Sequence, residues 1–122
     1  MKYILILITS LLSFGIYGQS TAEHSLNRAL QFCNKAVELN PKKDTVYYQR
    51  ANIKFMLKDF NGSIKDYNKA IELNSKYIDA YYSRGISKYK LGDKEGACLD
   101  WKNTLLLGDT ILAKEEISRY CK

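Results

Sequence analysis

The chain repeats itself at an interval of 34 residues. Residues 47–59 read YYQRANIKFMLKD and residues 81–93 read YYSRGISKYKLGD. When residues 44–77 are aligned with 78–111, many of the identities are spaced by three and four residues, as one face of a helix requires. A unit this short cannot bury its apolar face alone, so the copies are expected to stack. The identical pairs are Tyr47/Tyr81, Tyr48/Tyr82, Arg50/Arg84, Lys54/Lys88, Leu57/Leu91, Asp59/Asp93, Gly62/Gly96, Asp66/Asp100 and Leu73/Leu107.

Each copy predicts two helices joined by a turn. The first helix is expected over 44–57 and again over 78–91, and each ends in a short stretch that contains Gly and Asp. The second helix is expected over 61–73 and over 95–107, where apolar residues recur at three- and four-residue spacing. The sequence therefore predicts an all-α fold built from two helical hairpins.

The repeat frame extends beyond both copies. Residues 22–43 fit the second helix of a unit whose first helix is missing. A further helix is expected over 110–121, with Ala113, Ile117 and Tyr120 on one face. Stacked repeats need such terminal elements to cover their last apolar face. The prediction is a small stack of helices with a half-repeat at one end and a capping helix at the other.

The N-terminus has the layout of a secretory signal peptide. Residues 1–18 contain one basic residue, Lys2, followed by an apolar run and then small residues. The uncharged stretch falls short of the ~20 apolar residues that span a bilayer comfortably. Cleavage after Gly18 would leave 19–122 as a periplasmic or secreted domain without stable membrane insertion. The alternative is a retained anchor.

Composition excludes several classes of function. The net charge is +6, but the basic residues are spread along the chain, whereas a nucleic-acid site needs a basic stripe on one face. One His and no Cys-x-x-Cys spacing give no basis for a metal site. No Gly-rich phosphate loop or Ser/His/Asp order is present. We therefore expect no enzyme activity, no cofactor, no metal and no nucleic-acid partner.

The combined pattern resembles the tetratricopeptide repeat (TPR), a 34-residue helix–turn–helix unit that stacks into a superhelix. With Asp44 as position 1, the residues at positions 27 and 32 of the second copy, Thr104 and Asp109, depart from the family pattern. The resemblance covers 22–122 and implies an α-solenoid with repeats 44–77 and 78–111. The family's small and aromatic packing positions are filled by Tyr47, Tyr81, Ala51, Gly85, Ser63, Ala97, Tyr67 and Trp101.

The resemblance also implies a concave groove lined by the first helices. Aromatic side chains there offer large contact areas with few rotamers to immobilise. The chain is thus expected to be a non-catalytic adaptor that binds a peptide or a partner segment. The alternative is that the stripe packs against a second copy or the terminal helix. The expected groove residues are Tyr48, Asn52, Phe55, Tyr82, Ile86 and Tyr89, bordered by Gln49, Met56, Ser83 and Lys90.

One version of the family holds a C-terminal carboxylate with Lys and Asn side chains. Tyr48, Tyr82 and Ile86 stand at positions where those residues would be needed, so this specificity is not expected here.

The unpaired helix at 22–39 suggests a rival function. It would offer Leu26, Leu30 and Val37 to another chain, as in a homodimer or a structural subunit of an envelope complex.

Charged residues recur at the same two positions in both copies. Arg50 and Arg84 lie on the first helices, and Asp66 and Asp100 lie on the second helices. We expect a structural ion pair that joins the two helices of each repeat. The alternative is a pair of stacked arginines that captures an anion.

The three cysteines permit at most one internal disulfide. In a TPR stack, the start of the second helix that contains Cys98 lies beside the end of the terminal helix that carries Cys121. The resemblance therefore implies a Cys98–Cys121 disulfide, with Cys33 in a packing position.

Overall fold

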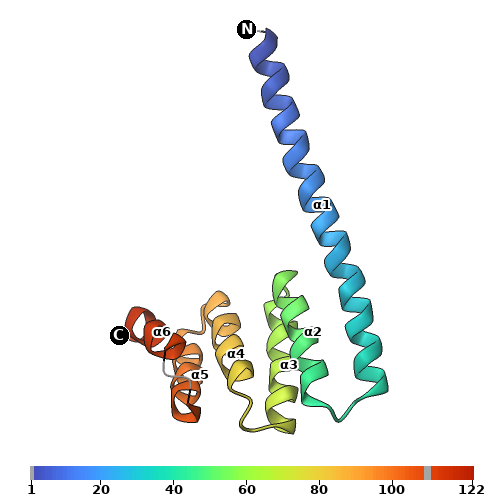
Figure 1. Cartoon of the computed structure of the whole chain (residues 1–122). Helices are drawn as coiled ribbons and strands as arrows, with labels where there is room; N and C mark the ends of the chain where they lie inside the picture. The colour runs from blue at the N-terminus through green and yellow to red at the C-terminus, as the bar shows by residue number, and fades with distance from the viewer. Residues whose placement is uncertain (1, 109–110) are drawn as a thin grey trace.

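The computed structural model describes residues 2–108 and 111–122, with side chains from residue 18 onward. These residues form six α-helices and no strand (Figure 1), which confirms the predicted all-α fold. The helices are α1 (Lys2–Leu39), α2 (Asp44–Met56), α3 (Phe60–Leu73), α4 (Ile78–Lys90), α5 (Lys94–Leu107) and α6 (Leu112–Tyr120).

Consecutive helices pack against one another in a single row (Figure 1). The hairpin of α2 and α3 and the hairpin of α4 and α5 make the most extensive contacts, and α3 packs on α4 to join them. Helix α1 covers one end of the row by packing on α2, and α6 covers the other end by packing on α5. The four hairpin helices coincide with their predicted ranges to within one residue at each end.

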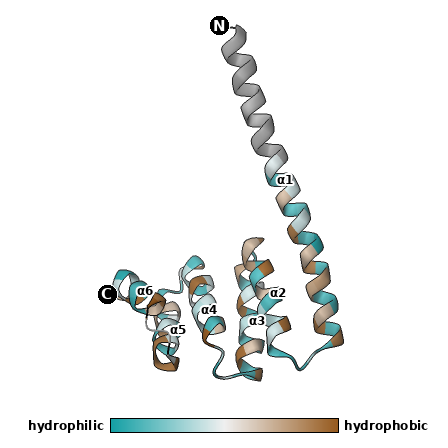
Figure 2. Cartoon of the chain, viewed as in Figure 1, coloured by the Kyte–Doolittle hydropathy of each residue, from teal (hydrophilic) through white to brown (hydrophobic). Residues whose placement is uncertain are grey.

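Helix α1 is longer than the predicted half-repeat. It runs without a break through residue 22, because residues 18–25 contain no proline and a single glycine. It therefore projects past the rest of the stack, with hydrophobic and hydrophilic residues mixed along its lower part (Figure 2). Of the predicted signal peptide, the side chains of residues 1–17 lie outside the described part, so cleavage stays a prediction. Within the described residues, no helix is both long and apolar enough to cross a membrane.

The second helix of each repeat begins with a side-chain cap. The carboxylate of Asp59 accepts a hydrogen bond from the Gly62 backbone N–H at 2.9 Å, and Asp93 does the same for Gly96. A Cβ atom at either glycine would collide with the capping carboxylate. The repeated Asp and Gly thus form one device that starts the helix.

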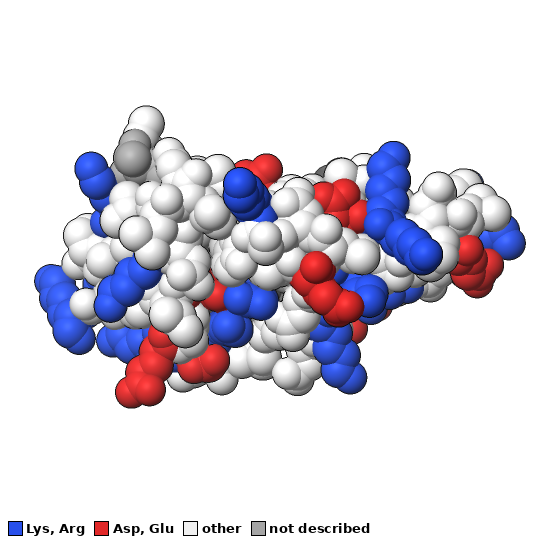
Figure 3. All heavy atoms as spheres, turned by 90° about the horizontal axis from the view of Figure 1, so that it is seen from below, with Lys and Arg blue, Asp and Glu red and all other residues white. Residues whose placement is uncertain are grey.

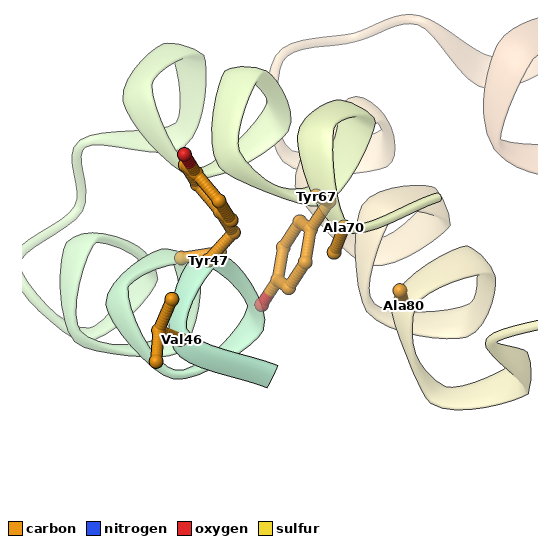
Figure 4. Packing of buried hydrophobic residues seen from close by; sticks show 6 residues of the cluster. Val46, Tyr47, Tyr67, Ala70 and Ala80 are labelled. Atoms are coloured by element: carbon orange, nitrogen blue, oxygen red, sulfur yellow. The ribbon is translucent and has the colours of Figure 1, made fainter. Parts of the chain in front are cut away.

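A large aromatic ring fills the centre of each hairpin. Tyr67 of α3 is 1% exposed and lies between Val46 and Tyr47 of α2 and Ala80 of α4 (Figure 4). In the second repeat the same position is Trp101, which is also 1% exposed. These rings supply most of the buried apolar volume in a core that otherwise consists of small side chains.

The residue opposite each ring is matched to its size. Ala51 is completely buried in the repeat that contains Tyr67, whereas Gly85 occupies its place in the repeat that contains Trp101. A Cβ at Gly85 would lie 2.6 Å from Trp101 Nε1, closer than real contacts allow. The larger indole is accommodated because the facing helix has no side chain there.

This pairing predicts the result of a double-mutant cycle. Gly85→Ala should lower the free energy of unfolding by about 1–3 kcal/mol, because it overpacks the site. Adding Trp101→Tyr reproduces the Ala51 and Tyr67 pair of the first repeat. The double variant should therefore lose less stability than the sum of the two single variants, measured by urea unfolding. Strictly additive losses would contradict the size-matching account.

Candidate functional site

The concave side of the first helices contains a pocket of about 180 Å³ between α2, α3 and α4. Five of its six lining residues are among those expected in the groove. The sixth, Tyr67, was assigned to the core on the basis of the sequence alone. The lining residues are Asn52, Phe55, Met56, Tyr67, Ser83 and Ile86.

The floor of this pocket carries the polar groups. The Tyr67 hydroxyl donates a 2.6 Å hydrogen bond to Asn52 Oδ1. Burial raises the pKa of Tyr67 far above its ordinary value, and a hydrogen bond with Ser83 lowers it in part. The phenol is therefore a neutral donor at physiological pH. Because its ring belongs to the core, Tyr67 gives the floor a fixed position.

Phe55, Met56 and Ile86 supply the apolar side of the pocket. Phe55 is held by an edge-on contact with Phe60, whose ring centroid is 5.3 Å away. Met56 is 54% exposed at the rim, where α2 ends. The pocket thus combines a rigid polar floor with an apolar rim that a ligand can reach.

Tyr48 supports the groove from the side. Its ring lies 4.9 Å from that of Tyr77 and 5.9 Å from that of Tyr67, and it packs against the core cluster. Burial raises the pKa of Tyr77 to about 12. Gln49 is exposed beside Tyr48. Neither Tyr48 nor Gln49 lines the pocket, although both were expected in the groove.

The second half of the expected groove faces the terminal helix. Tyr82 donates a 3.2 Å hydrogen bond to Glu116 of α6. The Tyr89 ring lies 4.5 Å from the Tyr120 ring, and Trp101 lies 5.9 Å from the same ring. Lys90 is exposed at the end of α4. Tyr82 and Tyr89 therefore form part of the seat of α6, which is the alternative that the sequence left open.

The repeated charges form an ion pair in each hairpin. Arg50 donates from Nε and Nη2 to the two oxygens of Asp66, both at 2.8 Å, and Lys54 adds a 2.9 Å contact. Arg84 and Lys88 surround Asp100 in the same way, at 2.6–3.0 Å. Charge-assisted bidentate pairs of this kind are among the stronger polar contacts in proteins.

Each arginine also reaches the preceding helix. Arg50 Nη1 donates to Asn34 of α1 at 3.2 Å, and Arg84 Nη1 donates to Asn68 of α3 at 2.8 Å. With their carboxylate-facing edges occupied, these arginines are arranged as structural links rather than as an anion site. The sequence analysis did not assign Asn34, Asn68, Lys54 or Lys88 to this network. Aligning residues 22–43 with 56–77 would have paired the two asparagines, because NKAVELN in the half-repeat matches NKAIELN in the repeat.

A disulfide joins Cys98 of α5 to Cys121, which directly follows α6; their Cα atoms are 5.7 Å apart. Cys33 is a half-buried free thiol whose pKa is raised by burial. A surface pocket of about 480 Å³ lies next to the disulfide. It is lined by Lys94, Glu95, Cys98, Leu99, Lys102, Tyr120, Cys121 and Lys122.

Charges are interspersed over the face of the molecule shown in Figure 3, where basic and acidic side chains alternate. Among the described residues, no group of three or more His, Cys, Asp and Glu side chains could hold a metal ion.

A row of helical hairpins that are packed side by side around repeated aromatic and small residues defines an α-solenoid repeat protein. The family model described as "TPR repeat" matches residues 51–92. A search of curated proteins gives no match. Together with the solved structures described next, this makes the chain a tetratricopeptide-repeat protein.

Several solved TPR structures are similar over most of the chain. The first TPR of Spaghetti (RPAP3), bound to the HSP90 peptide SRMEEVD, is 26% identical with a TM-score of 0.77, and the match covers 85% of this chain and 83% of that one. The Arabidopsis OM64 TPR domain is 27% identical with a TM-score of 0.76, covering 85% and 87%. MamA is 27% identical with a TM-score of 0.75, covering 78% of this chain and 56% of MamA.

The ion network gives a testable difference between buried and exposed pairs. Asp66→Ala leaves Arg50 and Lys54 without their carboxylate, and the carboxylate is only 6% exposed. Thermal and urea unfolding should show a loss of about 3–5 kcal/mol. The matched control is Glu72→Ala, which removes the exposed Lys69–Glu72 pair and should cost less than about 1 kcal/mol. Similar losses in both variants would refute a structural role for the buried site.

Proposed function

We propose that the chain is a non-catalytic adaptor that binds a peptide or an extended partner segment in the groove of its TPR stack. The pocket between α2, α3 and α4 is the observation that supports this proposal most directly. Ligand sites for drug-sized molecules usually have volumes of about 300–1,000 Å³. A pocket of about 180 Å³ is better suited to one large apolar side chain of a polypeptide.

The lining supports this choice of ligand. Phe55, Met56 and Ile86 provide an apolar contact for such a side chain. Asn52 and Ser83 place hydrogen-bonding groups beside it, where an extended peptide would present its backbone amides. Because Asn52 Oδ1 already accepts from Tyr67, its amide N–H groups are directed by that contact. The pocket would therefore recognise an apolar anchor and the main chain next to it.

Similar proteins support peptide binding as the general activity. The first TPR of Spaghetti is bound to an HSP90 peptide. We do not transfer that particular ligand, because Tyr48, Tyr82 and Ile86 replace the residues that a carboxylate clamp would need. The ligand of this chain is proposed to be held through an internal apolar side chain instead of its C-terminus.

The N-terminal sequence supports a proposed location. A signal peptide over residues 1–18 would deliver the adaptor to the periplasm or the exterior. N-terminal sequencing of the exported protein should then begin at Gln19. A chain that retains Met1 in a membrane fraction would favour an anchor.

Self-association through α1 is the second candidate. Leu26, Leu30 and Val37, which were expected to be offered to another chain, are half-buried, and Val37 packs against the core cluster. The residues that do face outward are Phe32 and Leu39, which are 74% and 68% exposed. Sedimentation equilibrium separates the two candidates: the adaptor proposal predicts a monomer, whereas a dimer that Phe32→Ala dissociates would favour self-association.

Peptide selection followed by calorimetry tests the groove. Peptides selected from a displayed random library should share one large apolar residue. Met56→Ala and Ile86→Ala should each weaken their binding about tenfold, which corresponds to about 1.4 kcal/mol at a contact in the centre of an interface. Leu106→Ala is the matched control, because Leu106 is 83% exposed on α5. The HSP90 peptide SRMEEVD serves as a negative ligand. Selection of no peptide, or equal binding by all variants, would overturn the proposal.

A further inference from the structure

Helix α6 covers aromatic residues that would otherwise continue the groove. Tyr82 and Tyr89 follow Tyr48 and Phe55 at the repeat interval, so they carry the lining surface from the first repeat into the second. Tyr120 of α6 lies against Tyr89 and Trp101, and Glu116 accepts from Tyr82. The pocket between α2 and α4 is therefore open, while the adjoining surface on α4 and α5 is covered by the chain itself.

The noncovalent contacts that hold α6 are few. The helix has nine residues, fewer than an isolated helix needs to be stable in water. Ala113 is its one fully buried residue, and Ile117 and Tyr120 are half-buried. Leu112 remains 49% exposed. A short helix with this little apolar burial depends strongly on its covalent tether.

That tether is the Cys98–Cys121 disulfide, which fixes the C-terminal end of α6 to the start of α5. Both cysteines line the surface pocket of about 480 Å³, so a small thiol can reach the bond. Lys94, Lys102 and Lys122 line the same pocket with one acid, Glu95. A predominantly basic surface attracts the thiolate, which is the form of a thiol that attacks a disulfide.

We propose that the Cys98–Cys121 disulfide is a redox lock on α6, and that its reduction uncovers the second half of the groove. The proposal rests on the proposed function, since it assigns a regulation to the same groove. In the oxidised protein a ligand reaches the pocket between α2 and α4. In the reduced protein the ligand also reaches Tyr82, Tyr89 and Trp101.

The chemistry is thiol–disulfide exchange with a dithiol reductant. One thiolate of the dithiol attacks a sulfur of the bond, forms a mixed disulfide and releases the other cysteine as a thiolate. The second thiol of the reductant, as its thiolate, then displaces the remaining cysteine. Cys98 and Cys121 together gain two electrons and two protons, and the dithiol is oxidised to a disulfide. The reverse exchange restores the lock.

Trp101 reports the position of α6 without any ligand. It is the only tryptophan in the chain, and it lies between Tyr89 and Tyr120. On reduction with dithiothreitol, its fluorescence should shift to longer wavelength and acrylamide quenching should increase severalfold. Hydrogen exchange should accelerate in residues 112–120 while α2 to α5 stay protected. Binding of the dye 1-anilinonaphthalene-8-sulfonate should rise, because aromatic surface becomes exposed.

Two variants serve as controls. Cys98→Ser/Cys121→Ser should show the open fluorescence without reductant and should not respond to dithiothreitol. Cys33→Ser should behave as the native chain does in both states. Mass spectrometry after alkylation confirms which thiols are free. A reduced protein that keeps Trp101 shielded and residues 112–120 protected would overturn the proposal. So would loss of helical circular dichroism across the whole chain, since the bond would then staple the entire fold.

Ligand binding separates this proposal from the proposed function. Peptides selected against the oxidised protein test the open pocket alone. Peptides selected against the Cys98→Ser/Cys121→Ser variant should bind it about tenfold tighter than they bind the oxidised native chain. If α6 opens but no peptide binds either form, the adaptor function fails, whereas peptides that bind both forms equally refute the lock.

Discussion

The buried carboxylates of Asp66 and Asp100 organise the stack. Each accepts from an arginine and a lysine of the preceding helix, and each arginine continues to an asparagine one helix further back. One site therefore fixes three consecutive helices: α1, α2 and α3 around Asp66, and α3, α4 and α5 around Asp100. A buried charge that loses its partners is costly, so the helices are held in a single relative arrangement. The groove is formed on the side of the first helices away from these sites.

The two repeats share this framework but differ on the groove side. In the first repeat, Tyr67 finds an acceptor in Asn52, and the two form the floor of an open pocket. In the second repeat, Ile86 stands in place of Asn52 and Trp101 in place of Tyr67. The Trp101 indole N–H is buried without a hydrogen-bond partner among the described residues. The second repeat thus gives up a polar contact and gains an apolar seat for Tyr120 of α6. This difference divides the groove into an open half and a covered half.

The helices, the hairpins and the ion pairs could be predicted from the sequence, because the 34-residue repeat determines which face of each helix is buried. The groove was harder. Spacing places Tyr48, Tyr82 and Tyr89 on the expected face, but it does not say what lies opposite them. Tyr82 and Tyr89 meet α6, a helix outside the two repeats, and Tyr48 meets Tyr77, which is in the turn between repeats. Tyr67 was missed because its ring belongs to the core and only its hydroxyl reaches the pocket.

The central claim is that ligands enter between α2 and α4 while α6 keeps the adjoining surface covered. Nuclear magnetic resonance of the ¹⁵N-labelled oxidised protein, titrated with a selected peptide, tests this claim most directly. The account predicts that the amide signals of Asn52, Phe55, Ser83 and Ile86 shift on binding, while those of residues 112–120 do not. Shifts concentrated on the outer face of α1, around Phe32 and Leu39, would contradict it.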